Sequence, residues 1–161
     1  MKLNQTDYNY SALIGKGALL TATDAHGALN TMTVSWGGTG VLWGKEVCFL
    51  FVRPTRYTFL FTQSGQNMSL SFFGDEKADV LRFCGTKSGR DVDKFKECGL
   101  KFDLKDGCAV FEDAKITLTL KKLYSDIIKK DCFIDTEPLK HYLKDDYHMM
   151  YVCEVLDVVQ E

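Results

Sequence analysis

The chain has 161 residues, of which 45% are hydrophobic, and its formal net charge at pH 7 is -2. This length suits one domain, over residues 1–161, whose core needs neither a metal nor a disulfide to be stable. The nearly neutral charge gives no basic surface for nucleic acid, and no apolar run approaches the ~20 residues that cross a bilayer. The first eleven residues are polar and lack the apolar stretch of a signal peptide. We therefore expect a cytoplasmic protein with no nucleic-acid or membrane partner.

The cysteines and histidines point to neither disulfides nor a metal site. No two of the six cysteines are spaced as C-x-x-C, and a chain without a secretory signal is expected to keep its thiols reduced. The three histidines, His26, His141 and His148, have no i, i+3 or i, i+4 spacing. We therefore treat the thiols as structural and expect no bound metal.

Strand patterns dominate the first third of the chain. Residues 17–23 and 28–35 are predicted to form a hairpin around the turn at 24–27, because the turn contains a glycine and the second segment alternates. The glycine-rich residues 36–40 are predicted to be a flexible loop. Residues 46–52 are continuously apolar, which is typical of a central strand buried on both faces.

The rest of the chain alternates between short helices and strands. The expected helices cover residues 55–62, 74–83 and 91–98, and the expected strands cover residues 67–73, 108–124, 127–134 and 147–159. Many short strands with a few brief helices indicate an antiparallel barrel or sandwich, with connections closer to a Greek key than to βαβ units.

A first bend, residues 53–58, combines groups that can hold a phosphate. It joins a buried strand to a helix start, where free backbone N–H groups point outward. Arg53 and Arg56 add two planar cations, and Tyr57 and Thr58 add two hydroxyls. The alternative is a strand that ends at a proline and is followed by a capped helix with surface arginines.

A second bend, residues 85–91, has the same character. Lys87, Ser88, Gly89 and Arg90 supply two cations, a hydroxyl and a permissive glycine just before a helix start. The alternative is that Ser88 simply caps the next helix. Two anion-binding bends in one small domain favour a phosphate ligand.

The strand at residues 30–36 carries polar side chains on both faces, which is unusual for a strand that only closes a core. Such a strand can hydrogen-bond the edge of a flat heterocycle while Met32 or Trp36 packs on the ring. The alternative is an edge strand with a solvated face. The candidate residues are Asn30, Thr31, Met32, Thr33, Ser35 and Trp36.

The sequence contains no familiar enzyme motif. There is no G-x-G-x-x-G after a strand, no P-loop and no G-x-S-x-G elbow. His148 lies beside the last predicted strand, where it is either a core histidine with its hydrogen bonds satisfied or a group near a redox centre. We identify no catalytic residue.

Four segments together resemble a known family. N-T-M-T-V-S-W-G-G at 30–38, V-R-P-T-R-Y-T at 52–58, S-F-F at 71–73 and C-G-T-K-S-G-R-D-V-D-K-F at 84–95 resemble the flavin reductase-like, FMN-binding split-barrel family, which includes flavoredoxins. The resemblance implies a six-stranded antiparallel split β-barrel of Greek-key topology. It also implies a homodimer with FMN bound near the subunit interface.

The resemblance also implies roles for particular residues. The strand from Asn30 to Ser35 would lie along the isoalloxazine and ribityl chain, with His148 near the flavin ring. The first bend would gather the phosphate, and Lys87 to Arg90 would close over it. Cys153 stands where the family commonly has glycine, which leaves the approach of the backbone to the flavin open at this point.

The function implied is that of an FMN-binding oxidoreductase in which NAD(P)H reduces FMN, and FMN then reduces a small molecule or a redox partner protein. Hydride transfer belongs to the flavin, so the protein needs only to bind and orient it. Two alternatives remain open. One is a flavoredoxin-like electron carrier with tightly bound FMN, and the other is a binding module that holds no flavin.

Overall fold

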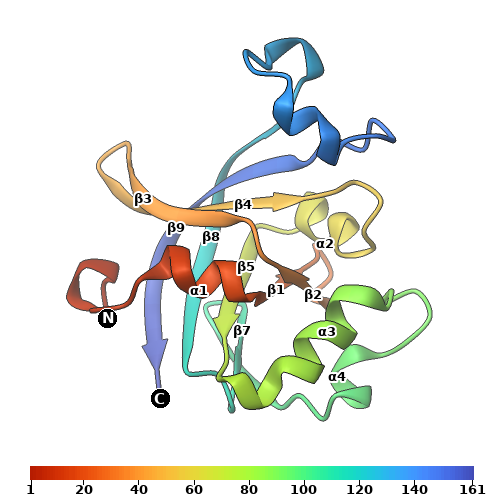
Figure 1. Cartoon of the computed structure of the whole chain (residues 1–161). Coiled ribbons are helices and arrows are strands. Elements are labelled where there is room, and N and C mark those ends of the chain that lie inside the picture. Colours follow the sequence, from red (N-terminus) through yellow and green to blue (C-terminus); the bar gives the residue numbers. More distant parts are fainter.

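A computed structural model describes all residues, 1–161, and consists mainly of antiparallel strands (Figure 1). The strands are β1 (Ala18–Thr23), β2 (Leu29–Val34), β3 (Gly37–Leu42), β4 (Lys45–Val52), β5 (Asn67–Phe72), β6 (Phe102–Lys105), β7 (Cys108–Phe111), β8 (Ile116–Ile127) and β9 (Met149–Gln160). The α-helices are α1 (Tyr10–Lys16), α2 (Thr58–Ser64), α3 (Ala78–Thr86) and α4 (Lys94–Glu97), and the 3₁₀-helices are η1 (Leu3–Gln5), η2 (Asp75–Lys77), η3 (Lys130–Cys132) and η4 (Glu137–His141). The expected class, mostly β with short helices, is confirmed. None of the helices has the length and apolar character needed to span a membrane.

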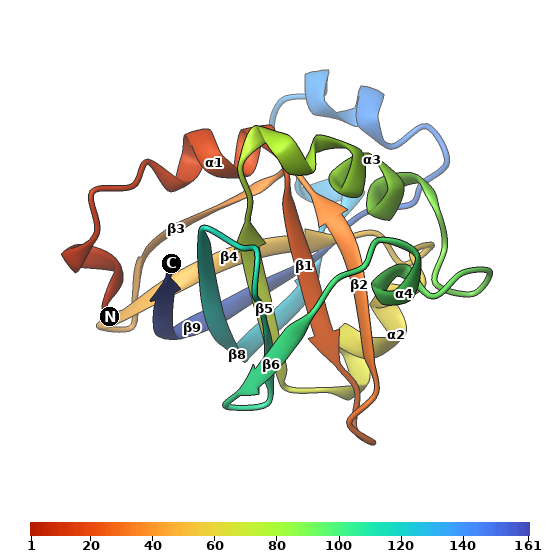
Figure 2. The ribbon, with the colours of Figure 1, turned by 90° about the horizontal axis from the view of Figure 1, so that it is seen from below.

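Seven strands form one antiparallel sheet in the order β2-β1-β5-β8-β9-β4-β3. β2 and β3 lie at opposite edges of this order, yet only Ser35 and Trp36 separate the end of β2 from the start of β3. Because this link spans at most about 10 Å, the two edges of the sheet must meet there. The sheet therefore curls into a barrel (Figure 2). The barrel stays split, because no backbone pairing joins β2 to β3.

The interior of this barrel is the main hydrophobic core. It contains fully buried side chains from the sheet, such as Leu20, Leu50 and Leu118, together with Tyr10 and Ile14 of α1. A second, smaller cluster lies outside the barrel and includes Leu19, Cys84 and Phe111. It packs α3 and the β6–β7 hairpin onto β1, and so places the end of α3 beside β2.

The glycine-rich residues after Trp36 form a strand, so the expected flexible loop at 36–40 is wrong. β3 pairs with β4 through a turn at Trp43 and Gly44, whose φ angles are 54° and 69°. Glycines lower strand propensity, but at the start of β3 a glycine lets the strand lie close to its partner: a Cβ at Gly37 would stand 2.5 Å from the Phe49 carbonyl oxygen. β3 also brings the sheet to seven strands, which corrects the expected six.

β4 is buried fully on only one face, which corrects the expectation that 46–52 is buried on both faces. Its inward side chains, among them Leu50, reach the core, whereas Phe49 and Phe51 on the outer face are only half-buried. The continuous apolar run at 46–52 therefore corresponds to a strand whose half-buried outer face is also apolar.

Several boundaries also differ from those expected. The segment 108–124 contains two strands, β7 and β8, because a turn at 112–115 interrupts the pairing. The expected strand at 127–134 is wrong, since β8 ends at Ile127 and η3 follows. The helix expected at 74–83 begins as η2 and continues as α3, and the one expected at 91–98 shortens to α4.

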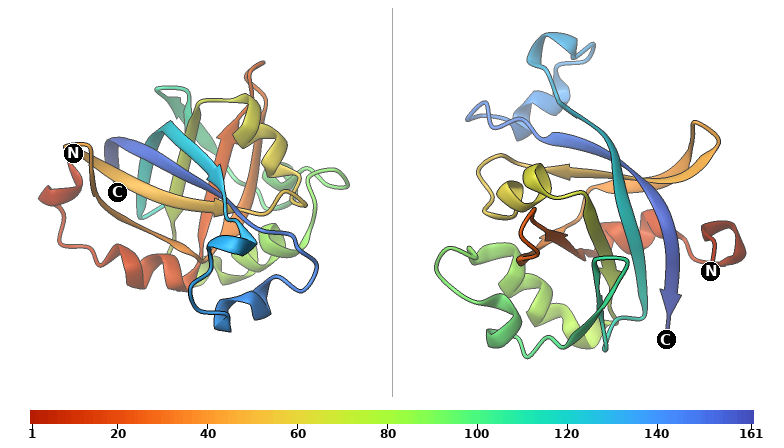
Figure 3. Two further views of the ribbon diagram at one scale, coloured as in Figure 1. Left: turned by 90° about the horizontal axis from the view of Figure 1, so that it is seen from above. Right: turned by 180° about the vertical axis from the view of Figure 1, so that it is seen from behind.

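Residues 128–148 form a lobe that projects from the barrel (Figures 1 and 3). An ion pair between Arg53 and Asp146, with an N–O distance of 2.9 Å, ties the lobe to the end of β4. His148, at the lobe's end, is buried, and its Nδ1 shares a hydrogen bond of 2.8 Å with the Tyr142 hydroxyl. The lobe thus lies beside the point where β2 passes to β3, since Trp36 packs near His148.

We predict that Gly37→Ala destabilises the protein by about 2–3 kcal/mol, because Gly37 has a φ of 148° and a Cβ there would stand 2.5 Å from the Phe49 carbonyl oxygen. Gly38→Ala is the matched control, since nothing lies within 4 Å of its added Cβ. The free energies of unfolding come from urea denaturation. Equal losses of unfolding free energy in the two variants would contradict this account of the close contact at Gly37.

Candidate functional site

The two bends that the sequence singled out line one cavity. This two-bend cavity has a volume of about 320 Å³ and is lined by residues 55–58 of the first bend, residues 85–90 of the second, and Lys94. The first bend joins β4 to α2, and the second follows α3. Segments thirty residues apart therefore present their cations and hydroxyls to one space.

Close packing holds the two bends together. A Cβ at Gly89 would stand 2.3 Å from Asn30 Oδ1 and 2.8 Å from Tyr57 Cδ1, so only glycine lets the second bend come this near. The Arg90 guanidinium lies 4.9 Å from the centre of the Tyr57 ring, within the range of a cation–π contact. Asn30 Nδ2 also donates a 2.8 Å hydrogen bond to Thr58 Oγ1.

The charge of this cavity is positive and uncompensated. None of Arg56, Lys87, Arg90 and Lys94 forms an ion pair with a carboxylate. Arg56 is half-buried, and burial lowers the pKa of its guanidinium. A partly desolvated cation without a counter-charge is costly, so the cavity favours an anionic ligand.

Lys94 is a site residue that the sequence did not single out. Its side chain is only 2% exposed, and its Nζ donates to the carbonyls of Thr31 at 2.9 Å and Cys84 at 2.8 Å. Burial lowers the pKa of this ammonium to about 8. The predicted helix at 91–98 is short and mostly polar, which is typical of a solvated element, so no local signal indicated that this lysine is buried.

β2 presents unpaired backbone groups toward the split. Asp24 N donates to the Ala28 carbonyl at 2.8 Å, so the even-numbered residues of β2 are the ones that bond to β1 in the antiparallel ladder. The amide groups of Thr31 and Thr33 therefore face the free edge. Lys94 donates to the Thr31 carbonyl, which leaves the N–H of Thr31 and both the N–H and C=O of Thr33 without a partner on this edge.

A second cavity, of about 170 Å³, lies at the end of β2. Its walls are residues 32–36, Phe51, Arg53, Arg56 and His148, and we call it the strand-end cavity. It shares Arg56 with the two-bend cavity, so the two cavities are adjacent and meet at this residue. Together they bring most of the predicted candidates to one place.

His148 is neutral at pH 7 in this environment. Burial, and then the positive charge of Arg53, lower the pKa of its imidazole to about 4. The rings of Trp36 and His148 lie 5.2 Å apart, and Trp36 itself is 45% exposed. The strand-end cavity is thus bounded by aromatic surface and by an uncharged imidazole.

Two predicted residues occupy different places from those expected. The Arg53 guanidinium pairs with Asp146 and donates to the His141 carbonyl at 2.9 Å, so it anchors the lobe and is not free for a phosphate. The Thr31 hydroxyl is fully buried and donates to the Leu20 carbonyl, so only the backbone of Thr31 reaches the ligand edge.

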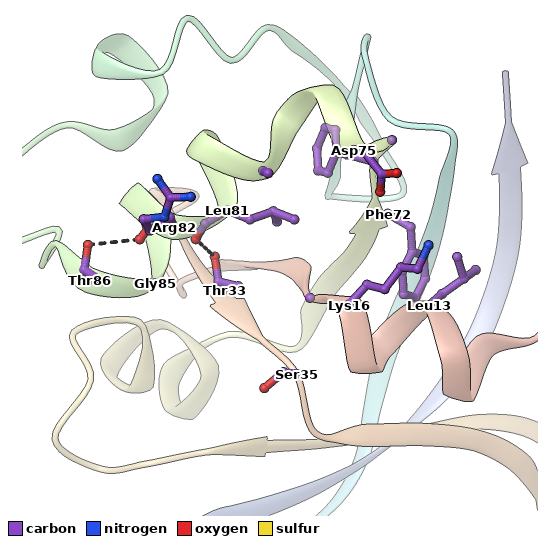
Figure 4. Close-up of a pocket in the computed structure, with 14 residues that line it drawn as sticks. Leu13, Lys16, Thr33, Ser35, Phe72, Asp75, Leu81, Arg82, Gly85 and Thr86 are labelled. Carbon is purple, nitrogen blue, oxygen red and sulfur yellow. Dashed lines mark hydrogen bonds between the residues drawn. The ribbon is translucent and has the colours of Figure 1, made fainter.

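A third cavity, of about 420 Å³, lies between α1 and α3 (Figure 4). Leu13 and Lys16 of α1, Phe72 of β5 and Leu81 of α3 line it. The Thr33 hydroxyl donates to the Leu81 carbonyl, so this side chain points toward α3. The cavity shares Thr33 and Ser35 with the strand-end cavity and Gly85 and Thr86 with the two-bend cavity, so it adjoins both.

No cysteine lines any of these three cavities. Cys153 is fully buried in the barrel opposite Cys48 and lines none of these cavities, so its side chain does not shape their walls. Burial raises the pKa of Cys153 to about 12, and all six cysteines are free. No group of His, Cys, Asp and Glu side chains is arranged to hold a metal ion.

The family model described as "Flavin reductase like domain" matches residues 11–161. The chain belongs to this family. No curated protein matches the sequence.

Solved structures similar to this flavin reductase like domain share its split-barrel fold at low sequence identity. An FMN-binding protein from Thermus thermophilus is 22% identical, with a TM-score of 0.68, over 90% of this chain and 71% of that one. A flavoredoxin from Methanosarcina acetivorans is 17% identical, with a TM-score of 0.71, over 100% of this chain and 75% of that one. The styrene monooxygenase flavin reductase from Pseudomonas putida S12 is 15% identical, with a TM-score of 0.64, over 89% of this chain and 78% of that one.

The buried imidazole gives this flavin reductase like domain a defined acid sensitivity. The unfolded chain protonates His148 near pH 6.5, whereas the folded protein resists until about pH 4, so stability is lost as the pH falls through this window. In His148→Gln we expect the fall in unfolding free energy between pH 6.5 and 4 to be smaller by about 1–2 kcal/mol. Urea denaturation across this pH range measures it, with the exposed His26→Gln as control. An unchanged pH dependence in His148→Gln would show that this residue is not the source.

Proposed function

We propose that this chain binds FMN without covalent attachment and transfers electrons through it as an oxidoreductase. The observation that carries the proposal is the two-bend cavity, where two arginine- and lysine-bearing bends and a buried lysine surround one space without a carboxylate. A dianionic phosphate matches this charge and these donors. The similar fold of the Thermus FMN-binding protein supports the same cofactor.

The residues present fit the two halves of FMN. Arg56, Lys87 and Arg90 would hold the phosphate, with Ser88 and the close approach at Gly89 completing the cradle. The planar ring would occupy the strand-end cavity along residues 32–36. When bound, FMN supplies the two-electron chemistry.

The chain's own groups would orient the ring and set its surroundings. The free N–H and C=O of Thr33 offer a donor and an acceptor to the edge of a heterocycle. The neutral imidazole of His148 and the ring of Trp36 provide polar and aromatic contacts without adding a charge. No side chain of the site is needed as a proton donor in this scheme.

We further propose NAD(P)H as the electron donor and a homodimer as the working form. The flavin reductase named among the similar structures supports the first. For the second, the exposed Trp43 and Tyr124, whose ring centres are 6.4 Å apart, and the exposed Val41 leave apolar surface beside β3, β4 and β8. A redox partner protein or a small molecule would then accept the electrons.

We predict that Arg56→Ala weakens FMN binding by about 10- to 150-fold, equivalent to about 1.5–3 kcal/mol for a charge-assisted hydrogen bond. Titration followed by the quenching of flavin fluorescence measures the dissociation constant. Lys144→Ala is the control, since Lys144 is exposed on the lobe and lines none of the cavities. Equal losses in both variants would refute the assignment of the phosphate site.

The electron donor separates the reductase from a flavoredoxin-like electron carrier, which would use the same FMN site. Stopped-flow mixing of the FMN-loaded protein with NADH and with NADPH follows the flavin absorbance. We expect one nucleotide to bleach it rapidly. No bleaching with either would leave the electron carrier, and a purified protein that is colourless and fails to bind added FMN would overturn the proposed function.

A further inference from the structure

Of the charged side chains that line the protein's cavities, that of Lys94 is the most deeply buried. It begins α4 next to its N-cap, Asp93, whose carboxylate accepts from Phe95 N and Lys96 N and is therefore already engaged. The Lys94 side chain runs inward to the walls of the two-bend cavity and of a neighbouring cavity of about 430 Å³ beside Phe61. Lys94 therefore forms part of the walls of two neighbouring cavities.

Its hydrogen bonds leave one donor unused. An ammonium has three N–H groups, and Lys94 gives two of them to the carbonyls of Thr31 and Cys84. Both acceptors are neutral, and no carboxylate forms an ion pair with Lys94. A buried ammonium held only by neutral carbonyls keeps its full charge uncompensated, which is a costly arrangement unless an anion comes within reach.

We propose that Lys94 is the buried counter-charge of the ligand's phosphate and makes the site selective for a phosphorylated flavin over riboflavin. This inference rests on the proposed function, because it presupposes that a flavin binds in these cavities. The exposed cations Lys87 and Arg90 attract the anion from solvent, where water and salt screen them. Lys94 acts in a desolvated setting, where the same charge interacts more strongly.

The surroundings of Lys94 make its effect depend on pH. The groups that face it are Cys84 from α3, Cys98 from the end of its own helix, and Arg56 from the first bend. Burial raises the pKa of both thiols, and that of Cys84 reaches about 12, so neither supplies a negative charge near neutral pH. The Lys94 ammonium, with a pKa of about 8, is therefore the group that loses its charge first as the pH rises.

The direction in which FMN affinity changes with pH follows from the order in which these groups titrate. Below pH 8 Lys94 is already protonated and an arriving phosphate finds its counter-charge. Above pH 8 binding must first take up a proton, so affinity falls by up to tenfold for each pH unit. Riboflavin carries no phosphate and should not show this dependence.

Lys94→Met, which keeps the length of the side chain and removes its charge, tests the proposal. We expect FMN affinity at pH 7 to fall by about 10- to 150-fold while riboflavin affinity changes less than threefold. Lys96→Met, on the exposed side of the same helix, is the matched control and should change neither affinity. Retained riboflavin binding also shows that the variant is folded.

The pH profile of the unaltered protein gives a second measurement that needs no variant. Between pH 7.5 and 9.5 we expect FMN affinity to fall about 10- to 30-fold and riboflavin affinity to stay level, and the FMN profile to become flat in Lys94→Met. Equal losses for FMN and riboflavin in the variant, or an FMN profile that is unchanged by it, would overturn the role of Lys94. Failure of the unaltered protein to bind either flavin would instead overturn the proposed function.

Discussion

Ser35 and Trp36 join one edge of a seven-stranded sheet to the other, and much of the structure depends on how short this link is. The sheet must curl so that its edges meet, yet β2 and β3 diverge from the link without pairing. β2 consequently keeps a free edge inside a folded protein, where unpaired amide groups are normally covered or bonded. Lys94 satisfies the Thr31 carbonyl, and the amide groups of Thr33 are left to a ligand.

The same geometry concentrates positive charge where the two bends meet. Arg56 and Lys94 lose part of their hydration on folding and gain no carboxylate in return. This costs stability in the ligand-free protein, and an anion that binds the folded state repays it. Folding energy and ligand binding are therefore linked at this site through charge.

Two arginines three residues apart show how strongly the lobe of residues 128–148 shapes the site. Arg53 turns toward the lobe, pairs with Asp146 and lies 5.1 Å from the centre of the Tyr142 ring. Arg56 has no such partner and faces the two-bend cavity. Arg53 supports the wall that holds His148, and by its charge helps to keep that imidazole neutral. One residue type thus contributes structure at one position and ligand-binding charge at the other.

The sequence by itself determined the features that depend on neighbouring residues. The hairpin at 17–35, the strand ending at Pro54 and both bends follow from alternation, proline and glycine, and the structure agrees at each. Only the tertiary structure decided that the glycine-rich residues 37–40 form a strand, because backbone pairing with β4 outweighs their low strand propensity. The burial of Lys94 and the ion pair of Arg53 with the lobe were likewise visible only in the tertiary structure, because both depend on segments far away in the chain.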